Sequence, residues 1–423
     1  MKYYILLICC ILLSCTPPSV KDYINSLDDV TIVLEDTLQP FQSSFLLEIK
    51  QPLDHKNLDK GFFKQRFYLN HKNINKPVVF IHAGYSLRKN KAHELSTVLD
   101  ANQIKVEYRF YGTSKPDSVL WEYLNSEQGL ADHHKIVSLF KPLYHGKWIA
   151  TGYSKGGASA LSHYRHYTSD FDVVIPYDAP ITFGKEDPRT TEFIYSVGSK
   201  EKRDSVLLFQ QTCLKRSTEL LPFFKEEANV YKTDFTWISA EEAFEYAVLE
   251  YSFTYWQRGH YTNSIPSPNA PAKELANHLL ATSGAWFYTD AGINTYLPSY
   301  YQHATELGYY GFPTKGLTHL LKHVKAPHND VFSPKNVDLT FKPGFVQDVS
   351  DWLETKGNNI IYLFGEYDPW AANYVDLSKN HTNSVRHIWD KGYHATKIKH
   401  LRAEQKADIA SRLSNWLQMD ITL

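Results

Sequence analysis

Short, continuous apolar runs recur along the chain, and such runs predict strands of a parallel sheet that is buried on both faces. The clearest runs lie at 77–82, 148–150, 172–177 and 359–364. Shorter or alternating runs predict further strands at 45–49, 62–69, 104–108 and 384–389. The pattern therefore predicts an α/β protein with a mostly parallel sheet of eight strands, six before residue 180 and two after residue 358.

The stretch between the sixth and seventh predicted strands, residues 181–345, has the sequence pattern of helices instead. Its amphipathic or helix-compatible segments lie at 203–228, 239–256 and 272–280, with a proline-rich loop at 263–271. Ser239 followed by Glu242 is a capping-box pattern, which marks the start of a helix. Apolar positions at helical spacing predict further helices at 126–144, 347–356 and 403–417. We therefore expect a large helical lid inserted after the sixth strand.

The predicted strand at 148–150 leads into Gly152-Tyr153-Ser154-Lys155-Gly156, and a helix-compatible segment follows. This is a G-x-S-x-G motif between a strand and a helix. A sharp turn of this kind holds the serine in a strained conformation, with its Oγ clear of the sheet and the helix N-terminus beneath it. Glycine is required on both sides because a Cβ collides with the neighbouring strand or helix. Ser154 is therefore the candidate nucleophile.

A nucleophilic serine needs an acid and a base, which the α/β-hydrolase fold supplies from loops after later strands, in the order Ser, Asp or Glu, His. Asp368 follows the predicted strand at 359–364, and His394 follows the strand at 384–389. Alone, Asp368 before a proline is typical of a turn, and His394 is one of 19 histidines. Two strand-end positions in the required order favour Asp368 as the acid and His394 as the base.

Backbone N–H groups complete a site of this kind, because they stabilise the oxyanion that forms when serine attacks a carbonyl. In this fold one donor comes from the loop after the third strand and the other from the residue after the serine. The run at 77–82 ends at Ala83-Gly84-Tyr85. We therefore predict the N–H groups of Tyr85 and Lys155 as the oxyanion hole.

The N-terminus, residues 1–15, has one basic residue, an apolar run and then Leu12-Leu13-Ser14-Cys15. This layout is typical of an export signal and is too short to span a bilayer. The last residues resemble the lipobox of bacterial lipoproteins, which predicts lipidation at Cys15 and a membrane-anchored, periplasmic or outer-surface protein. An ordinary signal peptide that is cleaved nearby is the alternative.

Composition limits the partners. Of the four cysteines, only Cys213 lies beyond residue 15, so we expect no intrachain disulfide and a fold held by its core. The 45 basic and 46 acidic residues give no electrostatic reason to expect nucleic acid as a partner. His319 and His323 are spaced like helical metal ligands, but the zincin glutamate is missing, so we expect no metal and no cofactor.

Several motifs together resemble known serine peptidases. Those shared with the prolyl carboxypeptidase and dipeptidyl peptidase II group are Gln51-Pro52-Leu53-Asp54-His55, Phe63-Lys64-Gln65-Arg66, Glu107-Tyr108-Arg109-Phe110-Tyr111-Gly112 and Ser126-Glu127-Gln128. Those closer to serine peptidase family 37, the secreted bacterial tripeptidyl aminopeptidases, are Gly84-Tyr85, Gly152-Tyr153-Ser154-Lys155-Gly156-Gly157, Gly365-Glu366-Tyr367-Asp368-Pro369-Trp370 and Gly392-Tyr393-His394. The first group is disulfide-stabilised and this chain cannot be, which favours the bacterial family.

The resemblance implies that Ser154, Asp368 and His394 form the triad of an enzyme that hydrolyses peptides near their N-terminus. Within the shared motifs, Glu107 and Trp370 are candidates for substrate binding. An exopeptidase also needs a carboxylate for the substrate amine, and the lid offers Glu241, Glu242, Glu245 and Glu250, although their spacing equally fits a solvated helix face. Two other functions stay open: an esterase or acyl hydrolase with the same triad, and a non-catalytic peptide-binding surface lipoprotein.

The patterns together divide the chain into five parts. We expect a lipoprotein signal at 1–15, a tether and lead-in at 16–40, hydrolase core at 41–180, the helical lid at 181–345 and the rest of the core at 346–423.

Overall fold

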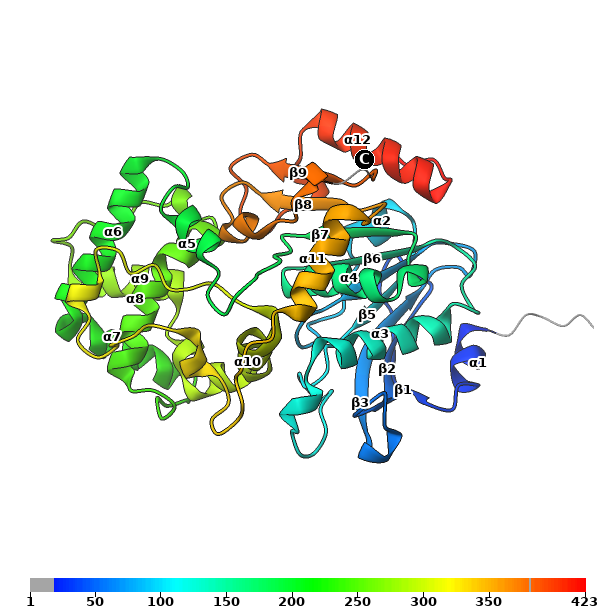
Figure 1. The fold of residues 1–423 in the computed structure, drawn as a ribbon, viewed down its shortest axis with the longest axis horizontal. Coiled ribbons are helices and arrows are strands. Elements are labelled where there is room, and N and C mark those ends of the chain that lie inside the picture. Colours follow the sequence, from blue (N-terminus) through cyan, green and yellow to red (C-terminus); the bar gives the residue numbers. More distant parts are fainter. Residues whose placement is uncertain (1–18, 380–381) are drawn as a thin grey trace, which may run out of the picture.

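The computed structural model describes residues 19–379 and 382–423, which fold around one sheet of nine strands (Figure 1). Along the sheet the order is β1-β2-β3-β5-β4-β6-β7-β8-β9. The strands are β1 Val30–Asp36, β2 Ser43–Pro52, β3 Phe62–His71, β4 Val78–His82, β5 Asn102–Val106, β6 Trp148–Tyr153, β7 Val173–Tyr177, β8 Ile361–Gly365 and β9 Val385–Trp389. Neighbours from β5 to β9 pair in parallel, whereas the pairs β1–β2, β2–β3 and β3–β5 are antiparallel. The predicted, mostly parallel α/β sheet is confirmed.

The sheet has one strand more than the predicted eight. The additional strand β1 lies within the predicted lead-in, after the short helix α1 Val20–Asn25. Most of β1 is exposed, including the apolar Val33 and Leu34, because it pairs only with β2 at the sheet edge. Its sequence therefore lacks the alternation of a half-buried strand, and its order comes from backbone pairing with β2.

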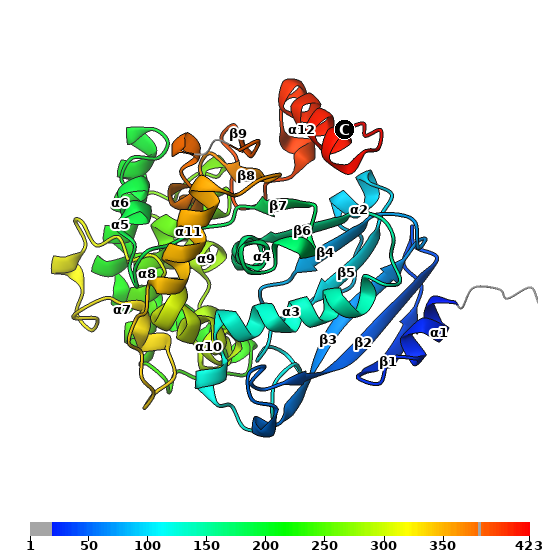
Figure 2. The same cartoon turned by 45° about the vertical axis from the view of Figure 1, so that its right-hand side comes forward.

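Helices cover both faces of the sheet (Figure 2). Both faces are apolar, because successive side chains of a strand point to opposite sides. In β4, Val78 and Phe80 pack into one hydrophobic core, and Val79 and Ile81 pack into the other. The first face carries α1, α3 Ser126–Phe140, α4 Lys155–His166 and α11 Gly344–Thr355, and the second carries α2 Glu94–Val98 and α12 Ala403–Leu417. The core is therefore a three-layer sandwich with the central strands buried on both sides.

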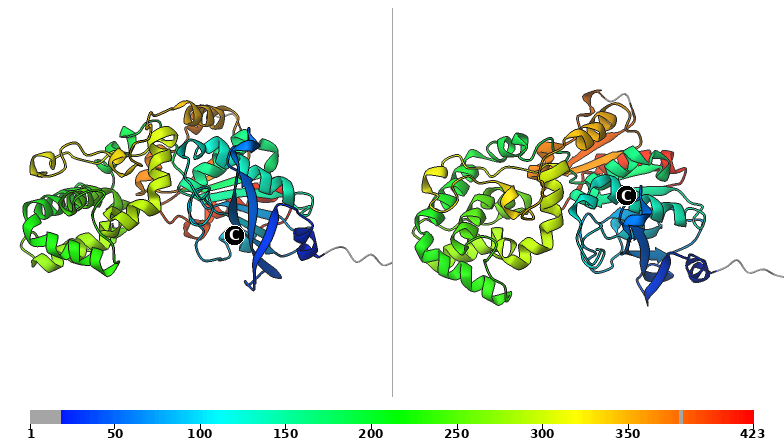
Figure 3. Two further views of the ribbon diagram at one scale, coloured as in Figure 1. Left: turned by 90° about the horizontal axis from the view of Figure 1, so that it is seen from below. Right: turned by 60° about the horizontal axis from the view of Figure 1, so that its bottom comes forward.

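The chain between β7 and α11 forms a helical insertion that stands beside the sheet (Figure 3). Its helices are α5 Pro188–Ile194, α6 Lys200–Lys215, α7 Ser217–Val230, α8 Ala240–Gln257, α9 Ala272–Ser283 and α10 Asp290–Gln302. These helices enclose a separate hydrophobic core around α8, which is apolar on nearly all sides. The predicted capping box is present, since Ser239 Oγ accepts from the Glu242 N–H and the Glu242 carboxylate accepts from the Ser239 N–H. The only cysteine beyond residue 15, Cys213, is buried in this core.

In the ranges 19–379 and 382–423, no helix combines the length and apolar character that crossing a bilayer requires. The predicted signal and the predicted lipidation residue Cys15 lie outside the described residues.

Candidate active site

Ser154 lies at the turn between β6 and α4, with φ of 55° and ψ of −127°. This left-handed φ is uncommon for a residue with a side chain, and such strain is concentrated at functional sites. The turn is tight enough to require glycine, because a Cβ on Gly156 lies 2.2 Å from the carbonyl oxygen of His82. The strand, turn and helix predicted from the G-x-S-x-G motif are all present.

The loops after β8 and β9 bring Asp368 and His394 together. The Oδ2 of Asp368 lies 2.7 Å from His394 Nδ1, and the carboxylate is fully buried. Its Oδ1 accepts from the N–H of Trp370, so the carboxylate also caps the short helix at Pro369–Asn373. The carboxylate is therefore fixed by its own loop and oriented toward the imidazole.

The electrostatic surroundings favour the charged form of His394. Burial acts to lower the pKa of His394, but the Asp368 carboxylate and, more weakly, Asp178 act to raise it, and the net shift is upward. The loop is also tied to the insertion, because the His394 N–H donates to the carbonyl of Gln257 at the end of α8, 2.9 Å away. The position of this imidazole thus depends on both parts of the molecule.

Asp178, which the sequence analysis did not single out, is a second carboxylate at this site. It follows β7, is fully buried, and has an oxygen within 4.8 Å of both the Asp368 and the His394 polar atoms. Its carboxylate accepts from Gly365 N–H, Thr396 N–H and Thr396 Oγ1. Burial and the charge of Asp368 raise the pKa of Asp178 above its usual range, whereas His394 and the Thr396 donors oppose this shift. Three donors already point at this carboxylate, which is not the arrangement of a metal ligand.

The side chain of Lys155 braces the predicted oxyanion loop. Its Nζ donates to the Gly84 carbonyl, 3.0 Å away, and lies 3.5 Å from the centroid of the Tyr108 ring. A trans peptide directs its C=O and N–H in opposite directions, so this bond aims the Tyr85 N–H away from the ammonium. Burial lowers the pKa of Lys155 to about 7, and the carboxylate of Glu306 opposes the shift.

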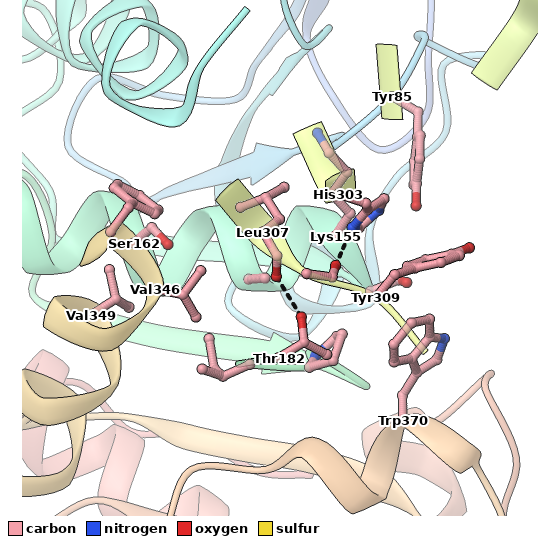
Figure 4. A pocket seen from close by; sticks show the side chains of 16 residues that line it. Tyr85, Lys155, Ser162, Thr182, His303, Leu307, Tyr309, Val346, Val349 and Trp370 are labelled. Carbon is pink, nitrogen blue, oxygen red and sulfur yellow. Dashed lines mark hydrogen bonds between the residues drawn. The ribbon is translucent and has the colours of Figure 1, made fainter. Parts of the chain in front are cut away.

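One cavity is lined by the candidate nucleophile Ser154, by both predicted oxyanion residues and by Trp370. Figure 4 shows this cavity from close by. Ser154, Tyr85, Lys155 and Trp370 line it from the core. The insertion contributes residues from a short π-helix, His303–Leu307, and from the segment after it: His303, Leu307, Gly308 and Tyr309. Ser154 therefore lines a space that is closed on one side by the insertion.

Trp370 joins the two parts of the molecule at this cavity. Its ring packs 5.4 Å from Tyr310 and 5.4 Å from Phe253, centroid to centroid, and Phe253 stacks on Tyr310 at 3.9 Å. These aromatic residues form one continuous wall from the loop after β8 to helix α8.

Glu107 lies away from the cavity. Its buried carboxylate accepts from Ser114 Oγ, from the Arg66 guanidinium and from the Leu87 N–H. It therefore braces the loop that follows Tyr85 and has an observed structural role, not a place in the cavity lining.

The four acidic residues of α8 differ in their partners. Glu241 pairs with Lys225, Glu242 forms the capping box, and Glu245 accepts from three backbone N–H groups at 322–324. Glu250 accepts instead from the hydroxyls of Tyr310 and Thr254. Burial raises the pKa of Glu250 to about 7. In the described part of the chain, no basic side chain forms an ion pair with Glu250.

Metal-ligating side chains also gather in places. Among the described residues, His319 and His323 belong to no cluster, so the spacing that suggested a metal pair is not matched by a third ligand. His82, His133 and His163 do form a cluster, which lies beneath the elbow.

Comparison with known proteins identifies the family of the chain. A family model described as PS-10 peptidase S37 matches residues 16–421. The prolyl tri/tetrapeptidyl aminopeptidase of Streptomyces mobaraensis is 31% identical over 404 residues, which cover 94% of this chain and 84% of that protein. The resemblance predicted from the motifs is thereby confirmed.

Two solved structures match this chain at low identity. A proline iminopeptidase of Mycobacterium smegmatis is 12% identical with a TM-score of 0.42, over 88% of this chain and 99% of that chain. Acetyl xylan esterase 1 from Thermoanaerobacterium sp. JW/SL YS485 is 10% identical with a TM-score of 0.39, over 93% and 90%. Because the family model spans nearly the whole chain, the protein belongs to the PS-10 peptidase S37 family and is a serine peptidase.

Proposed function

We propose that the protein is an exported serine exopeptidase that cuts short peptides from the free N-terminus of its substrates, with Ser154, His394 and Asp368 as its triad. The observation that carries this proposal is the strained serine at the β6–α4 turn in a protein whose Asp368–His394 pair lies at the neighbouring strand ends. The relative from Streptomyces mobaraensis is named for release of tri- and tetrapeptides, which supports the substrate class.

In this mechanism the Ser154 Oγ attacks the scissile carbonyl carbon while His394 Nε2 accepts the hydroxyl proton. Asp368 holds the Nδ1–H tautomer and stabilises the imidazolium that forms. The N–H groups of Tyr85 and Lys155 stabilise the oxyanion. His394 then returns the proton to the leaving amine, and a water molecule hydrolyses the acyl-enzyme with His394 again acting as base.

We propose Glu250 as the group that binds the substrate ammonium. The residue is partly buried, and among the described residues no lysine or arginine forms an ion pair with its carboxylate, although the charge of Arg258 reaches it. Tyr300 and Tyr309 lie within electrostatic range of both Glu250 and Tyr85, and Tyr309 lines the cavity, so the carboxylate belongs to the surroundings of the serine. A bound ammonium favours the ionised form of Glu250 and forms a charge-assisted contact of about 1.5–3 kcal/mol.

A peptide library with free and with acetylated N-termini tests the exopeptidase proposal, with the cleavage position measured by mass. We expect release of short N-terminal peptides from free amines only. Cleavage at internal positions regardless of acetylation would show an endopeptidase. Activity on long-chain p-nitrophenyl esters with none on peptides would favour the acyl hydrolase, and tight peptide binding without turnover would favour the binding protein.

Two variants separate the roles of the residues. A fluorophosphonate probe should label the wild type and fail to label Ser154→Ala; equal labelling of both excludes Ser154 as the nucleophile. Glu250→Gln should raise KM about tenfold or more for free-amine peptides, as expected for a charge-assisted contact. Glu241→Gln, a partly exposed change on the same helix, is the matched control.

We also propose that the mature protein is a membrane-anchored lipoprotein with its lipid on Cys15. The support is the N-terminal pattern of one basic residue, an apolar run and Leu-Leu-Ser-Cys. Cys15→Ala should move the protein to the soluble fraction. A wild-type protein that is already soluble and begins at another residue excludes the anchor.

A further inference from the structure

Three buried histidines meet beneath the nucleophile elbow, outside the predicted catalytic machinery. His82 ends β4, His133 lies in α3 and His163 lies in α4, and the side chains of all three are almost completely buried. One ring nitrogen from each lies within 4.8 Å of the other two. The aromatic rings of Phe80 and Phe171 pack around them. Burial of three imidazoles together in an apolar layer needs a physical reason, because each has two polar nitrogens.

The hydrogen bonds of His82 and His163 cannot all be satisfied by neutral rings. His163 Nε2 lies 2.9 Å from Oδ2 of Asp170, which only accepts, so this nitrogen carries the hydrogen and Nδ1 carries a lone pair. His82 has an acceptor on each side. Its Nε2 lies 2.9 Å from His163 Nδ1, and its Nδ1 lies 3.3 Å from the Thr151 carbonyl oxygen. Both neighbours of His82 are therefore acceptors, and a neutral imidazole has one N–H. With neutral rings, one nitrogen of His82 therefore faces an acceptor with no hydrogen between them, and an additional positive charge on the cluster would remove this conflict.

His133 strengthens this requirement. Among the residues that the structure describes, neither of its ring nitrogens has a hydrogen-bond partner, although the side chain is fully buried. Its ring lies 4.7 Å from the His82 ring, centroid to centroid, in a perpendicular arrangement. A buried polar group without a partner is costly, and such groups in folded proteins call for an explanation.

The missing charge could be a proton or a metal ion. All three rings are buried together in an apolar layer, so an added proton would place a charge there without water around it. A proton also satisfies only the His82–His163 contact and leaves His133 unpaired. A metal ion uses one lone pair from each ring. It also explains why the other nitrogen of His163 bonds to Asp170 and the other nitrogen of His82 lies next to the Thr151 carbonyl.

We propose that His82 Nε2, His163 Nδ1 and one ring nitrogen of His133 bind a transition-metal ion, with Zn²⁺ the first expectation, at a structural site beneath the elbow. Imidazole nitrogens suit zinc and copper, and the Asp170–His163 contact is the usual outer carboxylate of a metal-bound histidine. Zinc–nitrogen bonds of about 2.0–2.1 Å require the two facing rings to separate by a few tenths of an ångström. Asp170, which also binds His134, supplies negative charge next to the site.

The position of the cluster defines its role. Strand β4 leads into the Tyr85 loop, and α4 begins directly after Ser154. An ion shared by β4, α3 and α4 therefore fixes the serine turn and the oxyanion loop relative to one another without contacting the substrate. This inference departs from the expectation of no metal, which rested on sequence spacing alone. The three ligands lie on separate elements, so no short sequence motif contains them.

The metal content of untagged protein, purified without chelators, tests the proposal. We expect mass spectrometry to find about one zinc ion per chain, as for a structural site. His133→Gln should fall to the background, and His71→Gln should match the wild type, because His71 is a buried histidine of β3 that bonds to Tyr144 outside the cluster. X-ray absorption should show nitrogen neighbours at about 2.0 Å. Finding about one copper ion per chain instead would support the same three-histidine site and would change only the identity of the metal.

A second measurement needs no variant and so holds if His133→Gln fails to fold. The wild type is unfolded in guanidinium with a chelator, then refolded with and without Zn²⁺. We expect the zinc-refolded protein to bind the metal and to melt at a higher temperature. The proposal is overturned if neither the isolated nor the zinc-refolded wild type holds metal, or if His133→Gln retains as much as the wild type.

Discussion

At the residue scale, the side chain of Lys155 has a role separate from that of its N–H. Because Nζ bonds to Gly84 C=O, we expect Lys155→Met to lose the constraint on the Tyr85 N–H and to lower kcat about 10- to 100-fold, with little change in KM. The lowered pKa means that burial disfavours the Lys155 ammonium in the folded state. The charge therefore lowers the free energy of unfolding at every pH below about 10.5, and the loss is largest near and below pH 7. The variant should therefore melt at the same or a higher temperature. An unchanged kcat in steady-state kinetics contradicts the role.

Asp178 is predicted to position the pair and to set the pH profile. Its negative charge raises the pKa of His394, so Asp178→Asn should lower that pKa and move the acid limb of kcat/KM to lower pH, because the base becomes neutral earlier. The variant should also reduce kcat about tenfold, since an amide cannot accept from both Thr396 N–H and Gly365 N–H in the same way. Asp187→Asn, a buried carboxylate paired with Arg189, should leave the acid limb in place. A profile unchanged in Asp178→Asn would exclude the electrostatic role.

The contrast between Asp368 and Asp178 shows what sequence can predict at this scale. Asp368 and His394 follow apolar strands in the order that the serine motif demands, so their neighbourhood was predictable from position alone. Asp178 also follows a strand, but nothing in Tyr177-Asp178-Ala179-Pro180 separates a triad neighbour from a turn residue. Its significance arises from packing against Gly365 and Thr396, which are distant in sequence.

At the scale of elements, burial decides which parts of the fold were predictable. The buried strands β4, β6, β7 and β8 are mostly apolar, and the helix α12 lies where its amphipathic pattern predicts. Strand β1 was missed because an edge strand needs only backbone pairing. Helix α10 was missed because its sequence lacks a clear apolar stripe and contains Pro298.

The N-cap of α8 offers a test of element stability. Ser239 and Glu242 satisfy N–H groups at the start of the helix that forms the centre of the insertion core. Ser239→Ala should lower the free energy of unfolding by about 1 kcal/mol, because the hydroxyl acceptor is lost. Urea titration followed by tryptophan fluorescence measures the change. Ser205→Ala, within the exposed face of α6, is the control and should stay within about 0.5 kcal/mol of the wild type. Equal effects of the two changes would argue against the cap.

At the scale of the whole molecule, two hydrophobic cores meet at the candidate active site. The core of the sheet supplies Ser154, Asp368 and His394, while the insertion supplies the Gln257 carbonyl that holds the His394 N–H. The hydroxyl of Tyr261 in the insertion also donates to the Lys391 carbonyl, just before His394. Trp370 and the aromatic wall continue this contact into the cavity. We therefore infer that the insertion supports the loop after β9, which carries His394, and also closes the cavity.

This dependence predicts how activity is lost in urea. Phe244 is 2% exposed in the insertion core and packs edge-on against Phe224, so Phe244→Ala should cost about 3–5 kcal/mol there. Loss of α8 releases His394, and peptidase activity should then disappear at a lower urea concentration than the unfolding of the sheet measured by far-UV circular dichroism. Phe140→Ala removes a ring of the same size from the sheet core, and there the two transitions should move down together. If activity and sheet structure are lost together in Phe244→Ala as well, the two cores unfold as one unit, and the insertion is no separate support for the base.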